Sequence, residues 1–579
     1  MDTEQYEKPA GVRYEPDERP PGALALGLGV QLALLIVAGI VLTPAIVIRA
    51  AEGSESYINW AIFAAVIVSG LSTITQAVRV GRLGAGYVLA MGTSGAFIAV
   101  CVTALVQGGP AVLAALVIAS SLFQFTLSAR LSLLRRVLTP VVSGTVIMLI
   151  PVSVMPIIWD LLEDIPAAAN PAGAPISALI TLLAVVLIAL KATGVLRLWA
   201  LVIGIAVGSV ISSLFGLYDV QRVADAAWIG VPASGWPGIS FEFGPVFWSL
   251  LPSFIFVTLI GAIETIGDSV AIQRVSWRKP RAIDFRAVQG AVGADGLGNL
   301  LSGLAGTVPN TTYSSSVAVT ELTGVASRMV GIALGLVLII AAFSPKFLAL
   351  ILAIPGPVVG AYATVLLSML FVLGMKIVVQ HGIDYRGGVV VGVSFWIGVG
   401  CQGGVIFPGI VSEFAGGLLQ NGMTAGGLCA MLMNLFLIAA APRRRTIEMP
   451  LAATTLPMIQ KFLAQFAAHN DMDGVIESRL ELAGEETLYA LFGDETDEPR
   501  PERSLQIVAY RDGADAVLEF IASPGGENIQ DLLTVIKDTP SEPSADREVS
   551  LRLLRHAASS VDHQQYRDID IVTVRVGGR

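Results

Sequence analysis

The chain has 579 residues, of which 54% are hydrophobic and only 14% are charged, whereas soluble domains carry roughly 25% charged residues. Residues 22–442 hold 33 charged residues and residues 443–579 hold 39, and the last segment, with 24 acidic and 15 basic residues, accounts for the formal net charge of −9. This distribution excludes a chain that is soluble throughout and gives no basis for nucleic-acid binding. It predicts a polytopic membrane domain followed by a water-soluble domain.

The N-terminal residues 1–21 are acidic and proline-rich and lack the basic n-region and cleavage site of a signal peptide, so we expect a disordered cytoplasmic N-terminus. A membrane span needs about 20 apolar residues. Long apolar runs lie near residues 24–48, 57–78, 111–128, 137–157, 174–192, 198–216, 246–272, 328–344, 357–376, 385–404 and 424–442. Three more segments, near 86–105, 287–306 and 311–323, are broken by glycine, proline or polar residues. Together they predict an all-α membrane domain over 22–442 with 14 segments.

The distribution of basic residues predicts the orientation, because cytoplasmic loops are enriched in Lys and Arg. With the N-terminus inside, the outer loops carry only Arg49, Arg222 and Lys346. The inner loops carry Arg79, Arg82, Arg130, Arg135, Arg136, Lys191, Arg197, Arg274, Arg278, Lys279, Arg281, Arg286, Arg328, Lys376 and Arg386. We therefore expect both termini, including the tail after Arg443–Arg445, to be cytoplasmic, in the cell (inner) membrane.

Two interrupted segments occupy corresponding places in the chain. Residues 88–97 belong to the third predicted span and residues 307–320 to the tenth, seven spans apart, so two halves of seven spans would insert with opposite orientation. Interrupted segments at matching places in inverted halves indicate a transporter binding site, because free N–H groups and helix N-termini can hold a polar ligand there. The alternative is a re-entrant loop, or tight helix packing, with a purely structural role.

Three carboxylates lie where the surrounding residues are apolar. Glu264 and Asp268 are four residues apart and share one face of a predicted helix, and Asp295 lies in the next segment. Such residues usually face a cavity and serve transport or proton relay. The alternative is a structural role in binding backbone N–H groups of the broken helices. Glu321 is expected at the membrane interface.

Four blocks of sequence resemble the nucleobase–ascorbate transporter family (nucleobase:cation symporter family 2), which includes uracil and xanthine permeases. They are Pro140-Val-Val-Ser-Gly-Thr-Val146, Glu264-Thr-Ile-Gly-Asp268, Asp295-Gly with Pro309-Asn-Thr-Thr-Tyr-Ser314 and Leu322-Thr-Gly-Val-Ala-Ser-Arg328, and Ile354-Pro-Gly-Pro-Val-Val-Gly360. The resemblance implies a 7+7 inverted repeat with core and gate domains, and a homodimer.

The same resemblance implies roles for individual residues. Glu264 falls on the carboxylate that binds the base, Asp295 on one linked to proton coupling, and Ser94 and Ser314 on the ends of the half-helices. Asp268 joins Asp295 as a candidate for proton coupling. Gln31, Ser315 and Ser316 fall on further substrate-binding positions. The sequence departs from the family at Leu32, Gly95, Ser315, Ser316 and Ala318, which replace His, Phe, a long Gln or Glu, Asn and Gly.

Residues 443–449 are predicted to be a linker, and residues 450–579 a cytoplasmic α+β domain. We expect helices near 476–492 and 548–560 and strands near 505–510, 516–522 and 570–576. This order resembles the ATPase domain of anti-sigma-factor kinases, but Ala490 replaces the magnesium-binding Asn and Ser523-Pro-Gly-Gly526 replaces the Asp-x-Gly motif. The resemblance implies a degenerate domain that binds a cytoplasmic regulatory protein. We expect His381, His469, His556 and His563 at the surface.

These observations favour a proton-coupled symporter of a nucleobase-like solute of the xanthine, uracil or urate class, embedded in membrane lipid. We expect no enzymatic activity, no cofactor and no metal, since Cys101, Cys401 and Cys429 lie apart in apolar runs. One alternative is a solute sensor whose transporter-like domain signals through the tail. Another is an anion transporter of the sulfate-permease type, whose substrate Glu264 would repel.

Overall fold

The computed structural model divides the chain into two compact units, residues 1–278 with 287–436 and residues 279–286 with 437–579. The structure describes residues 11–134, 139–164, 170–380, 382–402, 404–406, 419, 421–440, 444–492, 503–512, 515–524, 528–535 and 546–577. Arg135, Arg136, His381, Arg443, Gly525 and Gly526 lie outside these ranges.

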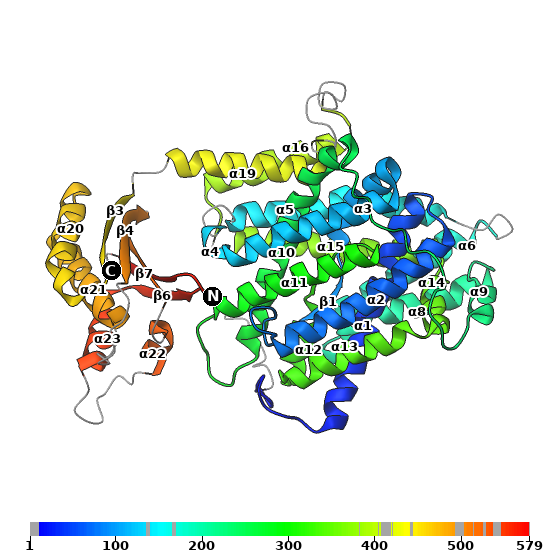
Figure 1. The fold of residues 1–579 in the computed structure, drawn as a ribbon, viewed down its shortest axis with the longest axis horizontal. Coiled ribbons are helices and arrows are strands. Elements are labelled where there is room, and N and C mark those ends of the chain that lie inside the picture. The colour runs from blue at the N-terminus through cyan, green and yellow to red at the C-terminus, as the bar shows by residue number, and fades with distance from the viewer. Residues whose placement is uncertain are drawn as a thin grey trace. The chain divides into compact units, whose positions relative to one another are not determined.

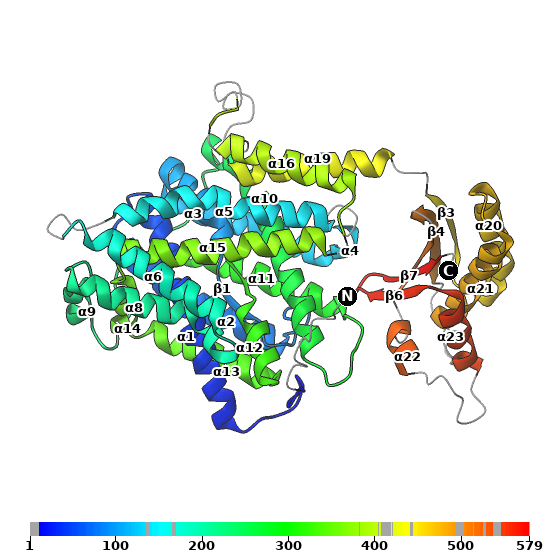
Figure 2. The same ribbon diagram turned by 180° about the vertical axis from the view of Figure 1, so that it is seen from behind.

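The first unit consists of long apolar helices that run alongside one another (Figures 1 and 2). Within the described ranges, eight segments are long and apolar enough to cross a membrane, and the bent pair α13–α14, with 89° between its helices, gives a ninth. The eight are α1 (Gly22–Ala50), α2 (Glu55–Val78), η1 (Gly95–Phe97) with α3 (Ile98–Ala129), α5 (Pro140–Glu163), α6 (Gly173–Lys191), α10 (Pro245–Val275), α15 (Gly356–Val379) and α19 (Gly422–Ala440).

Shorter elements complete this unit. They are β1 (Ala90–Thr93), α4 (Leu131–Leu134), α7 (Gly194–Leu198), α8 (Ala200–Leu214), α9 (Val220–Asp225), α11 (Phe285–Ala305), β2 (Asn310–Tyr313), α12 (Ser315–Thr323), α13 (Arg328–Ala342), α14 (Pro345–Leu352) and α16 (Tyr385–Gln402). The predicted helical membrane domain is confirmed, while the number of 14 segments stays a prediction.

The sequence led us to expect a break within 287–306, and this is wrong, because α11 is one continuous helix. Its glycines instead allow neighbouring helices to pack closely. A Cβ at Gly303 would lie 2.7 Å from the side chain of Ile118 in α3, and a Cβ at Gly298 would lie 2.8 Å from that of Ser72 in α2. By contrast, the predicted separation of 86–105 from 111–128 is seen as a kink in α3 at Gly109, whose φ is 78°, before Pro110.

The helices pack mainly within two groups. The core group contains α1, α2, α3, α10, α11, α12 and α13, and the gate group contains α5, α6, α8, α15, α16 and α19. Each group has a helix pair whose backbones touch at glycine: a Cβ on Gly70 would lie 2.7 Å from the carbonyl oxygen of Gly335, and a Cβ on Gly374 would lie 2.7 Å from that of Gly144. Small residues permit this close approach of membrane helices. The grouping agrees with the expected core and gate domains.

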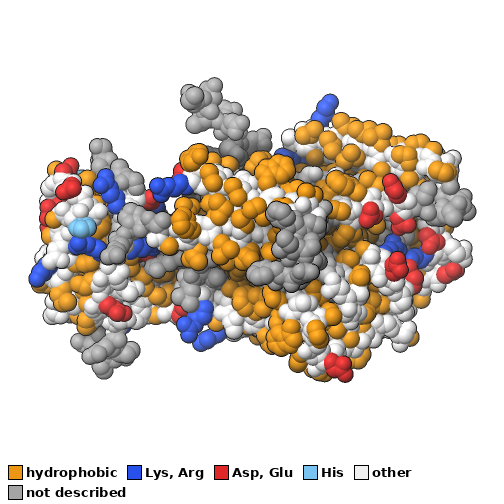
Figure 3. All heavy atoms as spheres, turned by 90° about the horizontal axis from the view of Figure 1, so that it is seen from above, with side chains coloured by type: hydrophobic (Ala, Val, Ile, Leu, Met, Phe, Trp, Pro, Cys, Tyr) orange, Lys and Arg blue, Asp and Glu red, His pale blue; other side chains and the backbone are white. Residues whose placement is uncertain are grey.

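The surface of the first unit matches a protein in a membrane. Figure 3 shows a broad hydrophobic surface over its helices, with charged side chains gathered toward its ends. Large apolar side chains such as Leu190, Leu214, Ile340 and Phe436 are 70–79% exposed. Lipid, which has no need of polar partners, can cover such a surface.

The expected disorder of the N-terminus is wrong for residues 11–21, whereas residues 1–10 lie outside the described ranges. Tyr14 pairs with Val325 in a parallel bridge, and the N–H of Arg13 donates to the carbonyl of Gly324 at 2.7 Å. Nearby, Glu18 forms an ion pair with Arg278 at 2.5 Å. Asp17 likewise forms an ion pair with Arg328, the first residue of α13, at 3.0 Å. The acidic residues that suggested a solvated N-terminus thus pair with basic residues just after α10 and at the start of α13. We call residues 11–19 the N-terminal strap.

The second unit contains a five-stranded antiparallel sheet with the order β3-β4-β5-β7-β6. Its elements are β3 (Arg445–Pro450), η2 (Ala453–Thr455), α20 (Leu456–His469), α21 (Gly474–Phe492), β4 (Ser504–Asp512), β5 (Asp515–Ala522), α22 (Ile529–Val535), α23 (Asp546–Ala557), β6 (Ser560–Gln565) and β7 (Asp570–Val576). Apolar side chains of the helices, including Phe466 and Leu480, form one core with Phe520 and Val572 of the sheet.

The predicted α+β character of the tail is confirmed by these elements. The linker prediction is wrong for residues 445–449, because they form most of β3, which pairs with β4 along its whole length. Alternation of Thr446, Glu448 and Pro450 with Ile447 and Met449 is typical of a strand with one buried face, but its partner begins more than 50 residues later.

His563 is buried, in contrast to the expected surface position. Its Nδ1 accepts a hydrogen bond from the N–H of Ile529 at 2.9 Å, at the start of α22. Burial, together with the nearby charge of Arg286, lowers the pKa of His563 to about 4. The imidazole is therefore neutral in the folded domain at pH 7.

We predict that the C-terminal domain loses stability as the pH falls from about 6.5 to about 4. In this range His563 binds a proton in the unfolded state but stays neutral in the folded state, because its pKa is lower there. The loss amounts to at most about 3 kcal/mol. Scanning calorimetry of the full chain at pH 7.5 and 5.0 measures it. His563→Gln should narrow the difference in unfolding temperature, whereas His469→Gln, at an exposed position, should not. An equal difference in all three proteins would contradict the prediction.

Candidate functional site

The interrupted segments meet as a pair of short strands in the middle of the core group. β1 and β2 are antiparallel, with Ala90 opposite Tyr313 and Thr93 opposite Asn310. The N–H of Ser94 extends the ladder by donating to the carbonyl of Pro309 at 2.9 Å. Within a membrane each backbone group needs a partner inside the protein, and the two strands provide partners for each other.

Each strand leads directly into a helix, and the ladder is antiparallel, so the two helices begin at opposite ends of the pair. After β1 the chain enters η1 and α3, and after β2 it enters α12. Helix N-termini expose N–H groups without intrahelical partners and carry partial positive charge. The strand pair therefore presents two donor-rich ends to the interior, and we call this arrangement the strand crossing.

Gly92 and Tyr313 fix the geometry of the strand crossing. A Cβ at Gly92 would lie 2.6 Å from the ring of Tyr313, so only glycine leaves room for the aromatic ring. The hydroxyl of Tyr313 donates to the carbonyl of Thr93 at 2.8 Å, and Thr93 Oγ1 donates to the carbonyl of Gly39 in α1 at 3.1 Å. These contacts join the crossing to α1.

Asp268 binds the start of α12 to α10. Its Oδ2 accepts a hydrogen bond from Thr312 Oγ1 at 2.8 Å, and its Oδ1 accepts one from Ser314 Oγ at 2.5 Å. Both donors are neutral, and both come from the interrupted segment that the sequence had singled out. Asp268 thus holds the second half of the crossing in place.

Asp295 is the centre of a second set of hydrogen bonds. Its Oδ2 accepts from Gln124 Nε2 at 2.6 Å and from Thr265 Oγ1 at 2.9 Å. Gln124 accepts in turn from Asn299 Nδ2 at 2.7 Å, and Asn299 accepts from the backbone N–H of Asn310 at 2.6 Å. This chain of hydrogen bonds connects α3, α10 and α11 with β2.

Glu264 differs from the two aspartates. It lies one turn before Asp268 and is half-buried, and no described residue donates a hydrogen bond to its carboxylate. Gly261, in the preceding turn, lies beside the strand crossing: a Cβ there would be 3.8 Å from the ring of Phe97 and 3.9 Å from Thr311 Oγ1. Glu264 thus lies about one turn along α10 from a residue that borders the strand crossing, and its acceptor oxygens have no donor among the described residues.

Three hydroxyls around the crossing are also without partners. Ser94 Oγ, Thr311 Oγ1 and Ser315 Oγ are buried and form no hydrogen bond with any described residue. Buried polar atoms are normally paired, so unpaired ones indicate a site that a ligand or water completes. Together with Glu264, they form a set of acceptors and donors that have no partner among the described residues.

The other two residues predicted to bind substrate have different surroundings. Ser316 Oγ accepts from the N–H of Ala90 and donates to the carbonyl of Tyr313, so it serves the strand crossing. Gln31 lies in α1, eight residues before Gly39, which corresponds to about 12 Å along the helix axis. No described residue forms a hydrogen bond with Gln31.

Sequence reasoning missed Thr265, Thr312, Gln124 and Asn299 as site residues. The first two lie inside the quoted motifs, next to the carboxylates that were named. Gln124 and Asn299 are amides in otherwise apolar helices, and polar residues within a span are the signal that would have found them.

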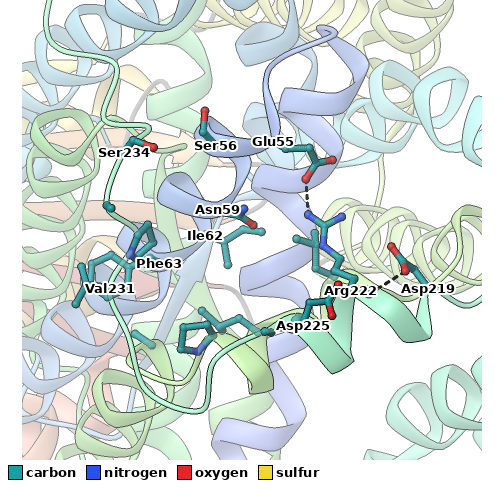
Figure 4. A pocket seen from close by; sticks show the side chains of 18 residues that line it. Glu55, Ser56, Asn59, Ile62, Phe63, Asp219, Arg222, Asp225, Val231 and Ser234 are labelled. Carbon is teal, nitrogen blue, oxygen red and sulfur yellow. Dashed lines mark hydrogen bonds and ion pairs between the residues drawn. The ribbon is translucent and has the colours of Figure 1, made fainter.

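Two cavities lie away from the strand crossing, at the ends of the helices. One, of about 650 Å³, is bordered by α2, α9 and α14 and is shown in Figure 4. There Arg222 lies between Glu55, with which it forms an ion pair, and Asp219, which accepts from its N–H at 3.0 Å. The second, of about 770 Å³, shares these three residues and extends to Arg49 and Asp164. Neither contains a carboxylate of the candidate site.

Comparison with known proteins identifies relatives. Residues 24–406 match the model of the Permease family (Xan_ur_permease). The xanthine permease XanP of Escherichia coli is 31% identical over 443 residues, covering 73% of this chain and 94% of that protein. The uric acid permease PucJ of Bacillus subtilis is 26% identical, covering 76% and 97%. The transmembrane domain of the cyanobacterial bicarbonate transporter BicA has a TM-score of 0.44 at 17% identity, covering 73% and 100%.

We predict that Thr312→Val lowers the unfolding temperature of the protein in detergent, because Asp268 loses one of its two donors. A hydrogen bond to a charged group contributes about 1.5–3 kcal/mol. Thr312→Ser should restore most of the stability. Thr364→Val is the matched control, since the hydroxyl of Thr364 donates to the carbonyl of Gly360 in its own helix. Equal losses at positions 312 and 364 would show that Asp268 does not depend on Thr312.

Proposed function

Since this chain belongs to the Permease family (Xan_ur_permease), and is thus a membrane permease, we propose that it carries a nucleobase of the xanthine, uracil or urate class together with protons. The relatives named xanthine permease and uric acid permease support this class of substrate. The matches extend over nearly the whole length of these relatives, so the comparison covers the complete transport domain.

The observation that carries the proposal is the carboxylate of Glu264, which has no hydrogen-bond donor among the described residues and lies one turn from Gly261 beside the strand crossing. Nucleobases present ring N–H groups and carbonyl oxygens in one plane. Glu264 can accept from the N–H groups, and the helix N-termini with Ser94 and Ser315 can donate to the carbonyls. The short serine side chain at 315, where the family has a longer one, leaves more of the recognition to the backbone.

Asp268 and Asp295 support proton coupling. Both accept hydrogen bonds from neutral side chains, and neither forms an ion pair with a Lys or Arg among the described residues. An intramembrane carboxylate without a cationic partner is a site at which a proton can neutralise the charge. Asp268 and Asp295, together with Glu264, disfavour the alternative of an anion transporter, because ionised carboxylates would repel its substrate.

The two helix groups support a mechanism of alternating access. The cavity of about 770 Å³ is lined by the ends of α1 and α2 from the core group and of α5 and α15 from the gate group. With the N-terminus inside, these ends face outward, and the cavity is the outer entrance. A homodimer in the cell membrane with both termini cytoplasmic completes the proposal.

The C-terminal domain is, in this proposal, an interaction or regulatory domain rather than an ATPase. Ala490, at the position of the magnesium-binding Asn in the related kinases, is buried within the core of the domain. A methyl group in that position cannot bind a metal ion. A solute sensor that signals through an enzymatic tail is therefore the weaker alternative.

We predict that Glu264→Gln abolishes uptake of radiolabelled xanthine and uracil while the protein still folds and inserts. The carboxamide keeps the shape of the side chain but loses the charge and one acceptor oxygen. Glu321→Gln, at an exposed position in α12, is the control and should transport normally. Near-normal uptake by Glu264→Gln at equal membrane abundance would refute the assigned role.

We predict that uptake depends on a proton gradient and not on sodium. Initial rates are measured in vesicles with an inward pH gradient in sodium-free buffer, with and without a protonophore. The protonophore should reduce uptake to the level of passive equilibration. Uptake that requires sodium and ignores the protonophore would disprove proton coupling.

A further inference from the structure

The loop between α10 and α11 belongs to the same compact unit as the C-terminal domain. Residues 279–286, which include the first two residues of α11 and which we call the loop, lie between the two helices that carry Glu264, Asp268 and Asp295, yet they pack with residues 437–579. The loop carries three basic residues, Lys279, Arg281 and Arg286, and one acidic residue, Asp284, whereas residues 443–579 hold 24 acidic and 15 basic residues. The charges of the two segments are therefore complementary.

This loop contacts the C-terminal domain at several places. The N–H of Ala282 donates to Asp531 Oδ1 in α22 at 2.5 Å. The ring of Phe285 packs against that of Tyr566, with 5.0 Å between centroids. Arg286 Nη2 donates to Gln565 Oε1 at 3.4 Å. These backbone, aromatic and polar contacts hold the loop against α22 and against the end of β6 with the turn that follows it.

The domain is also joined covalently to the last helix of the gate group. α19 packs on α5 and α16: a Cβ at Gly426 would lie 2.5 Å from the side chain of Leu149 and 2.6 Å from the carbonyl oxygen of Ser394. The chain between Ala440 and Arg444 spans at most about 14 Å when fully extended. A domain that holds the loop of the core group is therefore tied by a short segment to the gate group.

We propose that the C-terminal domain is a tether that restrains movement of the core group relative to the gate group by holding residues 279–286. The proposal rests on the proposed function in that transport requires such movement. Release of the loop makes the conversion between the outward-open and inward-open states easier. It does not change the groups that bind the substrate. It therefore raises the rate of transport without changing the substrate concentration for half-maximal uptake.

The docking is tested by a disulfide between Ala282→Cys and Asp531→Cys in a full-length chain whose three native cysteines are replaced by serine. We expect oxidation to cross-link this pair and not the control pair of Ala282→Cys with Asp512→Cys, which lies at the far end of β4. Absence of the first cross-link would overturn the proposal. This readout needs no substrate, so it stands even if nucleobase uptake fails.

The restraint is tested in the same oxidised and reduced proteins. Oxidation should lower the initial rate of xanthine uptake, and reduction should restore it. Asp531→Ala and Tyr566→Ala should raise the rate about twofold or more at unchanged half-saturation, as expected if a conformational step limits turnover. Arg575→Ala, which removes an exposed ion pair with Asp512, is the control and should leave the rate unchanged.

A final measurement tests the tether without relying on any particular substrate, because it follows the accessibility of the strand crossing. Ser94→Cys is added to the double-cysteine protein. Its thiol reacts with a membrane-impermeant reagent only when the strand crossing is open to the side of the membrane to which the reagent is added. Locking the Ala282–Asp531 pair before labelling should slow this reaction. Equal labelling rates and equal uptake with the loop locked or free would show that the contact has no role in transport.

Discussion

The structure of the membrane domain depends on one constraint, which is that backbone N–H and carbonyl groups deep in a bilayer must find partners within the protein. Two four-residue strands, β1 and β2, meet this requirement by pairing with each other. Their pairing brings two helix N-termini to the centre of the core group and places Thr311, Thr312 and Ser314 beside α10. The candidate site follows from this arrangement, because the carboxylates of α10 and α11 then face hydroxyl and amide donors.

The three carboxylates are similar in the sequence but differ in the structure. Asp268 and Asp295 each accept two hydrogen bonds from neutral side chains, and so contribute to holding the crossing together. The carboxylate of Glu264 accepts no hydrogen bond from a described residue, and the hydroxyls of Ser94, Thr311 and Ser315 are likewise without partners among the described residues. The structural alternative, in which the carboxylates bind backbone N–H groups of the broken helices, differs from what the aspartates do, because their donors are hydroxyl and amide side chains. The role of Glu264 in substrate binding stays a proposal. In that proposal the ligand would complete a site that the aspartates preorganise.

Features encoded locally could be predicted from the sequence, and those encoded by distant partners could not. The breaks at residues 88–97 and 307–320 and the spacing of Glu264 and Asp268 are visible in the chain itself. The strands β1 and β2 cannot be predicted locally, because Ala90 and its partner Tyr313 are far apart in the sequence, and the sequence predicts a linker in place of β3 for the same reason. The glycines of α11 suggested a break, but close packing against α2 and α3 decides their role. His563 gave no local sign of burial.

The N-terminal strap has a practical consequence for work on this protein. Residues 11–19 are fixed against Gly324–Arg328 and Arg278, so a fluorophore or affinity tag fused to Met1 is anchored within ten residues of the ends of α10 and α13. Ten residues reach at most about 35 Å. Salt screens the ion pair between the partly exposed side chains of Glu18 and Arg278 but not the backbone hydrogen bonds, so such a label would report how much of the attachment of the strap is electrostatic.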